Sequence, residues 1–257
     1  MIVRKTPAEI EAMARAGDIH VRTMNLLAGK VRAGVTTGEL DAAAEKFIRS
    51  QGATPAFKGY RGFPGSICAS PNHMVVHGIP GKFKLRKGDI LSIDIGVVKD
   101  GWVADGARTF AIGEISPVAA KLLQVTEESL FAAVDQCQVG NRLGDVSHAV
   151  QTHVEAEGLS VVRSLVGHGI GRSMHEEPQI PNYGPPGKGV VLEEGMVLAI
   201  EPMVTAGRHM VRMGDDGWAI YSQDGSLAAH FEFTVAITAE GPRILTPWHE
   251  SGHRAAA

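Results

Sequence analysis

The sequence contains few cysteines and few aromatic residues, and it has no long apolar run. Its 257 residues include two cysteines, Cys68 and Cys137, which cannot form a disulfide framework. The first residues lack a signal-type apolar segment, and no run approaches the length of a membrane span. The net charge of -3 gives no global field that would attract nucleic acid or an anionic membrane. These absences predict a cytoplasmic protein without a membrane partner.

Glycine, by contrast, is abundant, with 31 residues. Together with the low aromatic content, this composition indicates a turn-rich fold of mixed α and β structure and argues against disorder. The length allows one large domain or two small ones. One local basic run stands out, and it is more typical of a solvated loop than of a binding patch, although an RNA contact remains an alternative. The run consists of Lys82, Lys84, Arg86 and Lys87.

Two acids lie in a predicted hairpin in the middle of the chain. Asp94 interrupts an apolar run, and Asp105 follows eleven positions later. The dipeptide Asp100-Gly101 between them is a signal for a two-residue hairpin turn, which would bring the acids side by side. A carboxylate inside an apolar strand needs a partner, and three remain open: a cation such as Arg108, a solvated sheet face, or a metal ion.

The helical pattern and the central hairpin recur in the second half of the chain. Capping signals predict helices beginning at Thr6, Thr36 and Ser116, and a fourth near Gly144. At an offset of 106 residues the turn glycines and core positions of the two halves align, and at 107 residues Asp94 aligns with Glu201. This internal duplication predicts two halves packed about a pseudo-twofold axis, with a ligand site between them.

Five polar residues interrupt the apolar pattern in the predicted strands and turns. Four buried acids would repel one another and stay protonated unless divalent metal neutralised them. One imidazole among oxygen ligands suits Mn, Fe, Co or Zn, and carboxylates can bridge two such ions. Unrelated ion pairs could account for one or two of these acids, but not for the whole set at duplicated positions. The set comprises Asp94, Asp105, Glu201 and Glu232 in strands, and His168 in a glycine-flanked turn.

The order of these residues resembles that of the type I methionine aminopeptidases, a branch of metallopeptidase family M24. The strings that carry the resemblance are HGIP, IDIGVVKDGWVAD, GHGIG, HEEPQIP, GMVLAIEPM and HFEFTV, and the match extends from about Thr6 to Pro247. No zinc-ribbon or proline-rich segment precedes Thr6, so the resemblance is to the bacterial type without an N-terminal extension. Only 33 positions separate His168 from Glu201, so the insert of type II enzymes is absent.

The resemblance implies a fold and an activity. The fold is α+β, the pseudo-twofold "pita-bread" fold, with an antiparallel sheet covered by two pairs of helices from an internal duplication. Residues 1–257 would form a single catalytic domain with pseudo-repeats at about 6–112 and 117–240. The implied activity is removal of the initiator methionine from nascent proteins and peptides with a small second residue, through attack by a hydroxide that two metal ions activate.

The resemblance also implies roles for the site residues. Asp94 would chelate one metal ion, Asp105 and Glu232 would bridge both, and His168 with Glu201 would complete the second site. Glu201 would also shuttle a proton.

Two further histidines and an apolar pocket complete the implied site. His77 and His175 would line the cleft, with His175 contacting the scissile carbonyl or the oxyanion. The methionine pocket would be walled by Tyr60, Phe63, Cys68 and Trp218. The chain departs from the family's usual residues at Phe57, Phe63, Met174 and Leu165, which leaves the exact shape of this pocket open.

The implied partners are nascent peptides with an N-terminal methionine, with a transient ribosome contact, and the protein would be a monomer. Two alternatives remain. An X-Pro dipeptidase or aminopeptidase of the same fold usually carries a separate N-terminal domain, which about 80 residues before the first cleft histidine cannot supply. A non-enzymatic relative that binds protein or RNA would have little reason to keep five metal ligands.

Overall fold

The four α-helices of the described residues begin where the sequence satisfies their first backbone N–H groups. In the computed structural model, which describes residues 2–251, Thr6 and Thr36 each form a capping box with the glutamate three residues later. Ser116 caps the third helix, so these three predicted starts are confirmed. The fourth helix starts one residue before the predicted Gly144. The helices are α1 (Pro7–Ala28), α2 (Thr37–Ser50), α3 (Pro117–Asp135) and α4 (Leu143–Ala156).

The strands of the described part of the chain pair antiparallel throughout. They are β1 (Thr54–Pro55), β2 (Cys68–Pro71), β3 (Met74–Val76), β4 (Ile90–Lys99), β5 (Trp102–Ala111), β6 (Ser160–Val161), β7 (Val166–Gly169), β8 (Glu176–Pro181), β9 (Val197–Ile200), β10 (Met203–Thr205), β11 (Val211–Met213), β12 (Ile220–Ser222), β13 (Ala228–His230), β14 (Phe233–Thr238) and β15 (Gly241–Ile244). The larger sheets have the orders β1-β4-β2, with β5 beside β4, and β15-β14-β9-β7-β8. The smaller sheets have the orders β13-β10-β6 and β11-β12-β3.

The central hairpin forms as predicted. Asp100 and Gly101 are its two turn residues, with φ of 51° and 75°, the left-handed conformation that this tight turn requires. Asp105 pairs with Gly96, two residues along β4 from Asp94. Side chains two residues apart on a strand point the same way, so both acids lie on one face of the hairpin.

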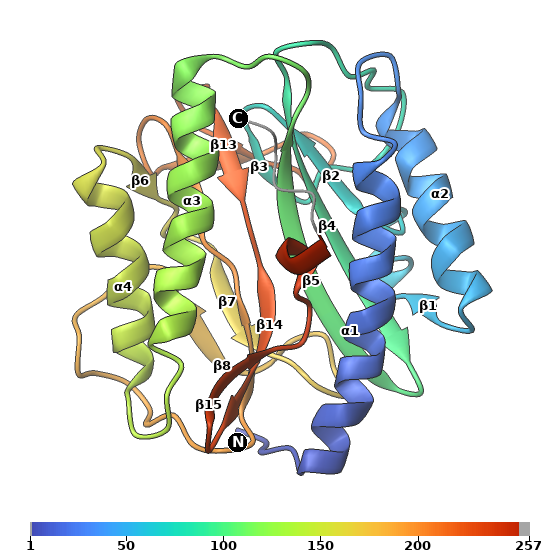
Figure 1. Ribbon diagram of the computed structural model, residues 1–257. Helices are drawn as coiled ribbons and strands as arrows, with labels where there is room; N and C mark the ends of the chain where they lie inside the picture. Colours follow the sequence, from blue (N-terminus) through green and yellow to red (C-terminus); the bar gives the residue numbers. More distant parts are fainter. Residues whose placement is uncertain (1, 252–257) are drawn as a thin grey trace.

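Each half of the chain places a helix pair against its own strands (Figure 1). Helix α1 packs on β4 and β5, while α3 packs on β9, β10 and β13. In Figure 1 the first pair lies on the right and the second on the left, with strands between and behind them. The predicted α+β architecture with two helix pairs and pseudo-twofold symmetry is therefore confirmed. No helix within residues 2–251 is long and apolar enough to cross a membrane. Residue 1 and residues 252–257 of the predicted domain lie outside the described residues.

The two halves meet where β5 runs beside the segment that joins β13 to β14. The backbones of Ala107 and Glu232 exchange two hydrogen bonds there, of 2.9 and 3.3 Å. The hydroxyl of Thr109 donates to the carbonyl of His230 (2.8 Å) and accepts from its N–H (3.0 Å). These bonds place the acids of the first half against those of the second.

The structure corrects the predicted secondary structure at three site residues. His168, expected in a turn, lies in strand β7. Glu201 and Glu232, expected inside strands, lie in short breaks, one between β9 and β10 and one between β13 and β14. Pro202, directly after Glu201, has no N–H for a strand ladder. The strand therefore ends at β9 and resumes as β10. The breaks face each other because β9 pairs with β14 and β10 pairs with β13.

Candidate metal centre

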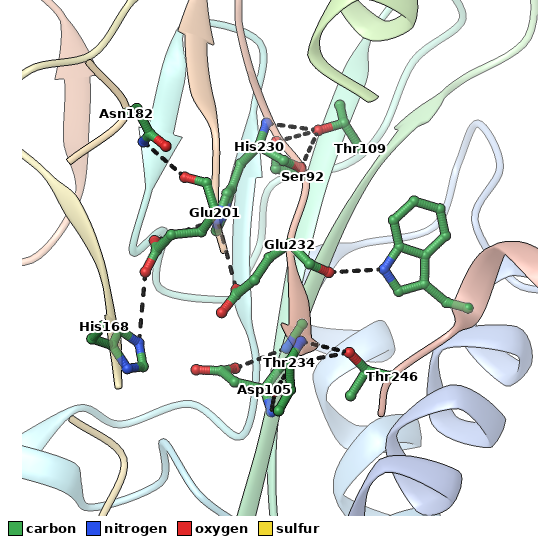
Figure 2. A network of polar contacts seen from close by, with 12 residues as sticks. Ser92, Asp105, Thr109, His168, Asn182, Glu201, His230, Glu232, Thr234 and Thr246 are labelled. Atoms are coloured by element: carbon green, nitrogen blue, oxygen red, sulfur yellow. Dashed lines mark hydrogen bonds and ion pairs between the residues drawn. The ribbon is translucent and has the colours of Figure 1, made fainter. Parts of the chain in front are cut away.

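The predicted ligands gather where the two halves meet. Asp105, His168 and Glu232 each offer a ligand atom, and these atoms all lie within 4.8 Å of one another. Oε1 of Glu201 lies 3.6 Å from Nε2 of His168, and Figure 2 shows both side chains extending toward the other acids. Asp94 is close enough to Asp105 for a hydrogen bond between their carboxyl groups. The structure thus brings all five predicted ligands together.

Burial and mutual repulsion make these acids hard to ionise in the absence of a cation. Burial raises the pKa of Asp105 to about 7. The pKa values of Asp94, Glu201 and Glu232 rise well above the ordinary range, first because of burial and then because of the neighbouring carboxylates. The pKa of His168 falls to about 4, again chiefly through burial. The cluster therefore favours neutral groups until a positive charge enters it.

The donor set fits divalent metal ions. Oδ1 of Asp94 and Oε1 of Glu232 are buried and have no hydrogen-bond partner among residues 2–251, so each offers a free lone pair. Nδ1 of His168 lies 2.9 Å from the carbonyl oxygen of Gly169. Since a carbonyl only accepts, Nδ1 carries the proton, and Nε2 is free to bind metal. Oxygen donors with an imidazole suit Mn, Fe, Co or Zn.

Strand β14 and the segment after β15 fix the backbone of two of these acids. Thr234 exchanges hydrogen bonds with the backbone of Asp105, at 3.0 and 2.8 Å, and Thr246 donates to the same carbonyl at 3.3 Å. The indole N–H of the fully buried Trp248 donates to the carbonyl of Glu232 at 3.0 Å. Sequence reasoning assigned Thr246 and Trp248 no role, because no local pattern connects residues 245–248 to the acids.

The predicted cleft histidines lie beside the acid cluster. The His175 ring centroid is 4.3 Å from that of His168, and Nδ1 of His175 lies 2.9 Å from the hydroxyl of Tyr60. His77 is exposed and has a left-handed φ of 61° directly after β3. The structure therefore places one edge of the site at an open surface.

The loop that carries His175 is anchored at two points. The adjacent Glu176 pairs with Lys5 at 2.7 Å, and the Lys5 side chain is only 2% exposed. The Arg172 guanidinium lies 3.8 Å from the centre of the Trp102 ring and donates to backbone carbonyls of the hairpin turn. The loop thus joins the N-terminal segment to the tip of the hairpin that bears the acids.

An apolar cluster lies beside the acids. Phe63 and Trp218 make an edge-to-face contact with ring centroids 5.1 Å apart. Cys68 pairs with Asp94 across β2 and β4, so the apolar wall adjoins the polar site. The cluster includes all four predicted pocket residues together with two positions that depart from the family's usual residues: Tyr60, Phe63, Cys68 and Trp218, with Phe57 and Met174.

Sequence reasoning missed His230. Its Nε2 atom lies 3.6 Å from Oε2 of Glu201 and 3.7 Å from Oε2 of Glu232. The signal was present, because His230 and Glu232 are separated by two positions in an extended segment, and such side chains point the same way.

Comparisons with known proteins agree with this geometry. The model of the family "Metallopeptidase family M24" matches residues 11–239. "Methionine aminopeptidase" of Clostridium perfringens is 54% identical over 246 residues, which cover 96% of this chain and 99% of that protein. "Methionine aminopeptidase 1" of Bacillus subtilis is 53% identical over 246 residues, with the same coverage of both chains.

A solved structure extends the likeness to the fold. The crystal structure of methionine aminopeptidase from Rickettsia prowazekii matches with a TM-score of 0.94 and 40% identity, over 96% of this chain and all of that one. The predicted pita-bread fold is therefore confirmed. A family of metallopeptidases uses divalent metal, as the buried acids require. The chain thus belongs to metallopeptidase family M24, and within it to the methionine aminopeptidases.

Proposed function

We propose that this protein is a methionyl aminopeptidase that removes the initiator methionine from nascent proteins and peptides with a small second residue. The observation that carries the proposal is the convergence of buried acids around His168, next to an apolar cluster that includes Phe63 and Cys68. The names of relatives more than half identical to this chain support it. Residues 1–257 would act as one catalytic domain, with pseudo-repeats at about 6–112 and 117–240.

Two divalent ions of Mn, Fe, Co or Zn would occupy the acid cluster. Asp94 would hold one, His168 and Glu201 the other, and Asp105 and Glu232 would bridge both. When bound, such ions supply an activated water and polarise the peptide carbonyl.

The chain's own residues would orient the substrate and move the proton. Glu201 would take up a proton and pass it to the leaving amine, because its carboxyl group lies within the cluster, 3.6 Å from Nε2 of His168. If the hydroxyl of Tyr60 donates to Nδ1 of His175, the remaining proton is on Nε2, which can donate to the carbonyl oxygen as charge develops there. His77 would line the opposite edge of the cleft.

The apolar cluster would bind the methionine side chain. Phe63 and Trp218 present ring edges and faces, and a thioether makes modestly attractive contacts with aromatic rings. Tyr60 and Cys68 would close the pocket toward the acids. A branched or charged first residue would fit this wall poorly.

We further propose that the protein acts as a cytoplasmic monomer on chains emerging from the ribosome. The basic run is exposed in the structure and would make a transient ribosome contact through Lys82, Lys84, Arg86 and Lys87. Reversing these four charges should weaken co-sedimentation with ribosomes, and unchanged binding would remove this contact from the proposal. Light scattering after gel filtration would test the monomer.

Peptide hydrolysis tests the proposed activity. The protein loaded anaerobically with Mn²⁺ or Co²⁺ should release methionine from Met-Ala-Ser and leave Ala-Pro intact. Asp105→Asn should lose metal and activity together, whereas the matched control Asp100→Asn, in the exposed hairpin turn, should keep both. Full metal-dependent turnover by Asp105→Asn would contradict the assignment, and cleavage of Ala-Pro alone would favour the X-Pro alternative.

A further inference from the structure

His230 is a buried histidine inside the acid cluster that the five predicted ligands do not include. It is 2% exposed and closes strand β13, two residues before Glu232. Its Nε2 atom has no hydrogen-bond partner among the described residues. A buried polar atom without a partner is destabilising. A group that moves close enough to form a hydrogen bond with Nε2 would therefore stabilise the site.

Two carboxylates lie within 4 Å of this nitrogen, and His77 is a further ionisable group whose charge acts on the His230 imidazole. Oε2 of Glu201 lies 3.6 Å away, and Oε2 of Glu232 lies 3.7 Å away. Once bound metal has ionised both carboxyl groups they only accept hydrogen bonds, so the nitrogen that faces them is then the one that carries the proton. Each distance exceeds a hydrogen bond by a few tenths of an ångström, and a small rotation of either acid would close it.

The backbone that carries the imidazole is held in place. Thr109 bonds both the N–H and the carbonyl of His230, at 3.0 and 2.8 Å, and Ser92 bonds Thr109 at 2.8 Å. His230 also pairs with Met203 across β13 and β10. The backbone of His230 is therefore fixed beside the acids, and rotation of the imidazole or of either carboxyl group is enough to close the hydrogen bond.

The carboxylate of Glu201 lies between two imidazoles. Its Oε1 faces His168 and its Oε2 faces His230 (Figure 2). His168 is the predicted ligand, so metal would bind on the Oε1 side. The Oε2 side then needs a donor, and His230 is placed to supply it.

We propose that His230 is a positioning residue, whose Nε2–H donates to the outer oxygens of Glu201 and Glu232 and turns their inner oxygens toward the metal ions. This inference rests on the proposed function, because it assumes that both acids bind metal. Hydrogen bonds that orient metal ligands are typically worth about 10- to 100-fold in metal affinity.

Two substitutions separate the donor from the packing. His230→Gln keeps an N–H donor the same number of bonds from the backbone, whereas His230→Met keeps the length without a donor. His153→Leu, at a partly exposed position of α4 where the imidazole contacts Glu128 instead of the acid cluster, is the control for loss of a histidine. Circular dichroism of the metal-free variants checks folding, and His230→Leu offers a second variant without a donor if His230→Met does not fold.

The readouts are Mn²⁺ affinity and stoichiometry by calorimetry, the visible spectrum of the Co²⁺-loaded protein, and kcat and KM for Met-Ala-Ser. His230→Met should bind the same number of ions about 10- to 100-fold more weakly and lower kcat more than it raises KM. His230→Gln should restore the metal affinity and kcat to within a few-fold of the wild-type values, a difference of about 1 kcal/mol.

Two results would overturn the inference. Unchanged affinity and spectrum in His230→Met would show that no positioning bond exists, and a loss of one bound ion with an altered Co²⁺ spectrum would make His230 a ligand instead. Failure of the proposed function looks different, since the wild-type protein itself would then bind no metal and release no methionine.

Discussion

Replacing His20 with glutamine should make the metal-free protein less sensitive to acid. His20 is fully buried on α1, and its Nε2 lies 2.9 Å from the carbonyl oxygen of Gly106, next to Asp105. The carbonyl accepts, so Nε2 carries the proton. Nδ1 is buried without a partner in residues 2–251, so a second proton would create an uncompensated charge. Burial accordingly lowers the pKa of His20 from 6.5 to about 4.

The free energy of unfolding decreases as pH falls, because the unfolded state binds the proton of His20 first. As pH falls below 6.5 the unfolded chain protonates His20, whereas the folded chain does so only near pH 4. The contribution of His20 to the free energy of unfolding is therefore fully present above pH 6.5 and is lost as pH falls toward 4. Its full size is about 3 kcal/mol, of which about 2 kcal/mol is lost by pH 5.

Urea unfolding in the presence of a chelator, followed by circular dichroism at pH 8 and pH 5, measures this effect. The buried acids titrate in both proteins, so their contribution cancels when His20→Gln is compared with the wild type. Between pH 8 and pH 5 the wild type should lose about 2 kcal/mol more than His20→Gln. Parallel profiles for the two proteins would refute the reasoning.

Three further substitutions test how the site is held. Trp248→Phe keeps an aromatic ring but removes the N–H that donates to the Glu232 carbonyl. It should lower the free energy of unfolding by about 1–2 kcal/mol in urea and weaken metal binding in calorimetry. Lys5→Met leaves the half-buried Glu176 without its cation; it should lower the free energy of unfolding in urea by about 2 kcal/mol, and adding Glu176→Gln should recover part of the loss. Tyr60→Phe removes the hydroxyl that bonds the cleft imidazole; it should lower kcat about tenfold without changing metal affinity, and an unchanged kcat would contradict that role.

Local signals in the sequence predicted most of the fold. The capping boxes at Thr6 and Thr36 fixed two helix starts, since these motifs satisfy backbone groups within a few residues. The Asp100-Gly101 dipeptide predicted the hairpin turn and its left-handed φ angles. The duplication predicted that the halves pair and that their acids converge, because equivalent positions of a repeat occupy equivalent places about its axis.

Local sequence patterns could not predict the long-range contacts. Apolar residues on both sides of Glu201 and Glu232 indicated continuous strands. In the structure Pro202 ends the strand at Glu201, and the neighbouring strand is interrupted opposite it at Glu232. Trp248 reaches Glu232 only through a tertiary hydrogen bond, which no spacing reveals. His230 could have been found from its alternation with Glu232, which places both side chains on one face of an extended segment.

The central claim is that the converging acids form a dimetal site for methionine release. Anaerobic calorimetric titration of the metal-free protein with Mn²⁺, with free methionine from Met-Ala-Ser assayed at each addition, tests it most directly. We expect two bound ions per chain and methionine release that rises as the sites fill. Saturable metal binding without methionine release, or release that is independent of added metal and resistant to chelator, would contradict it.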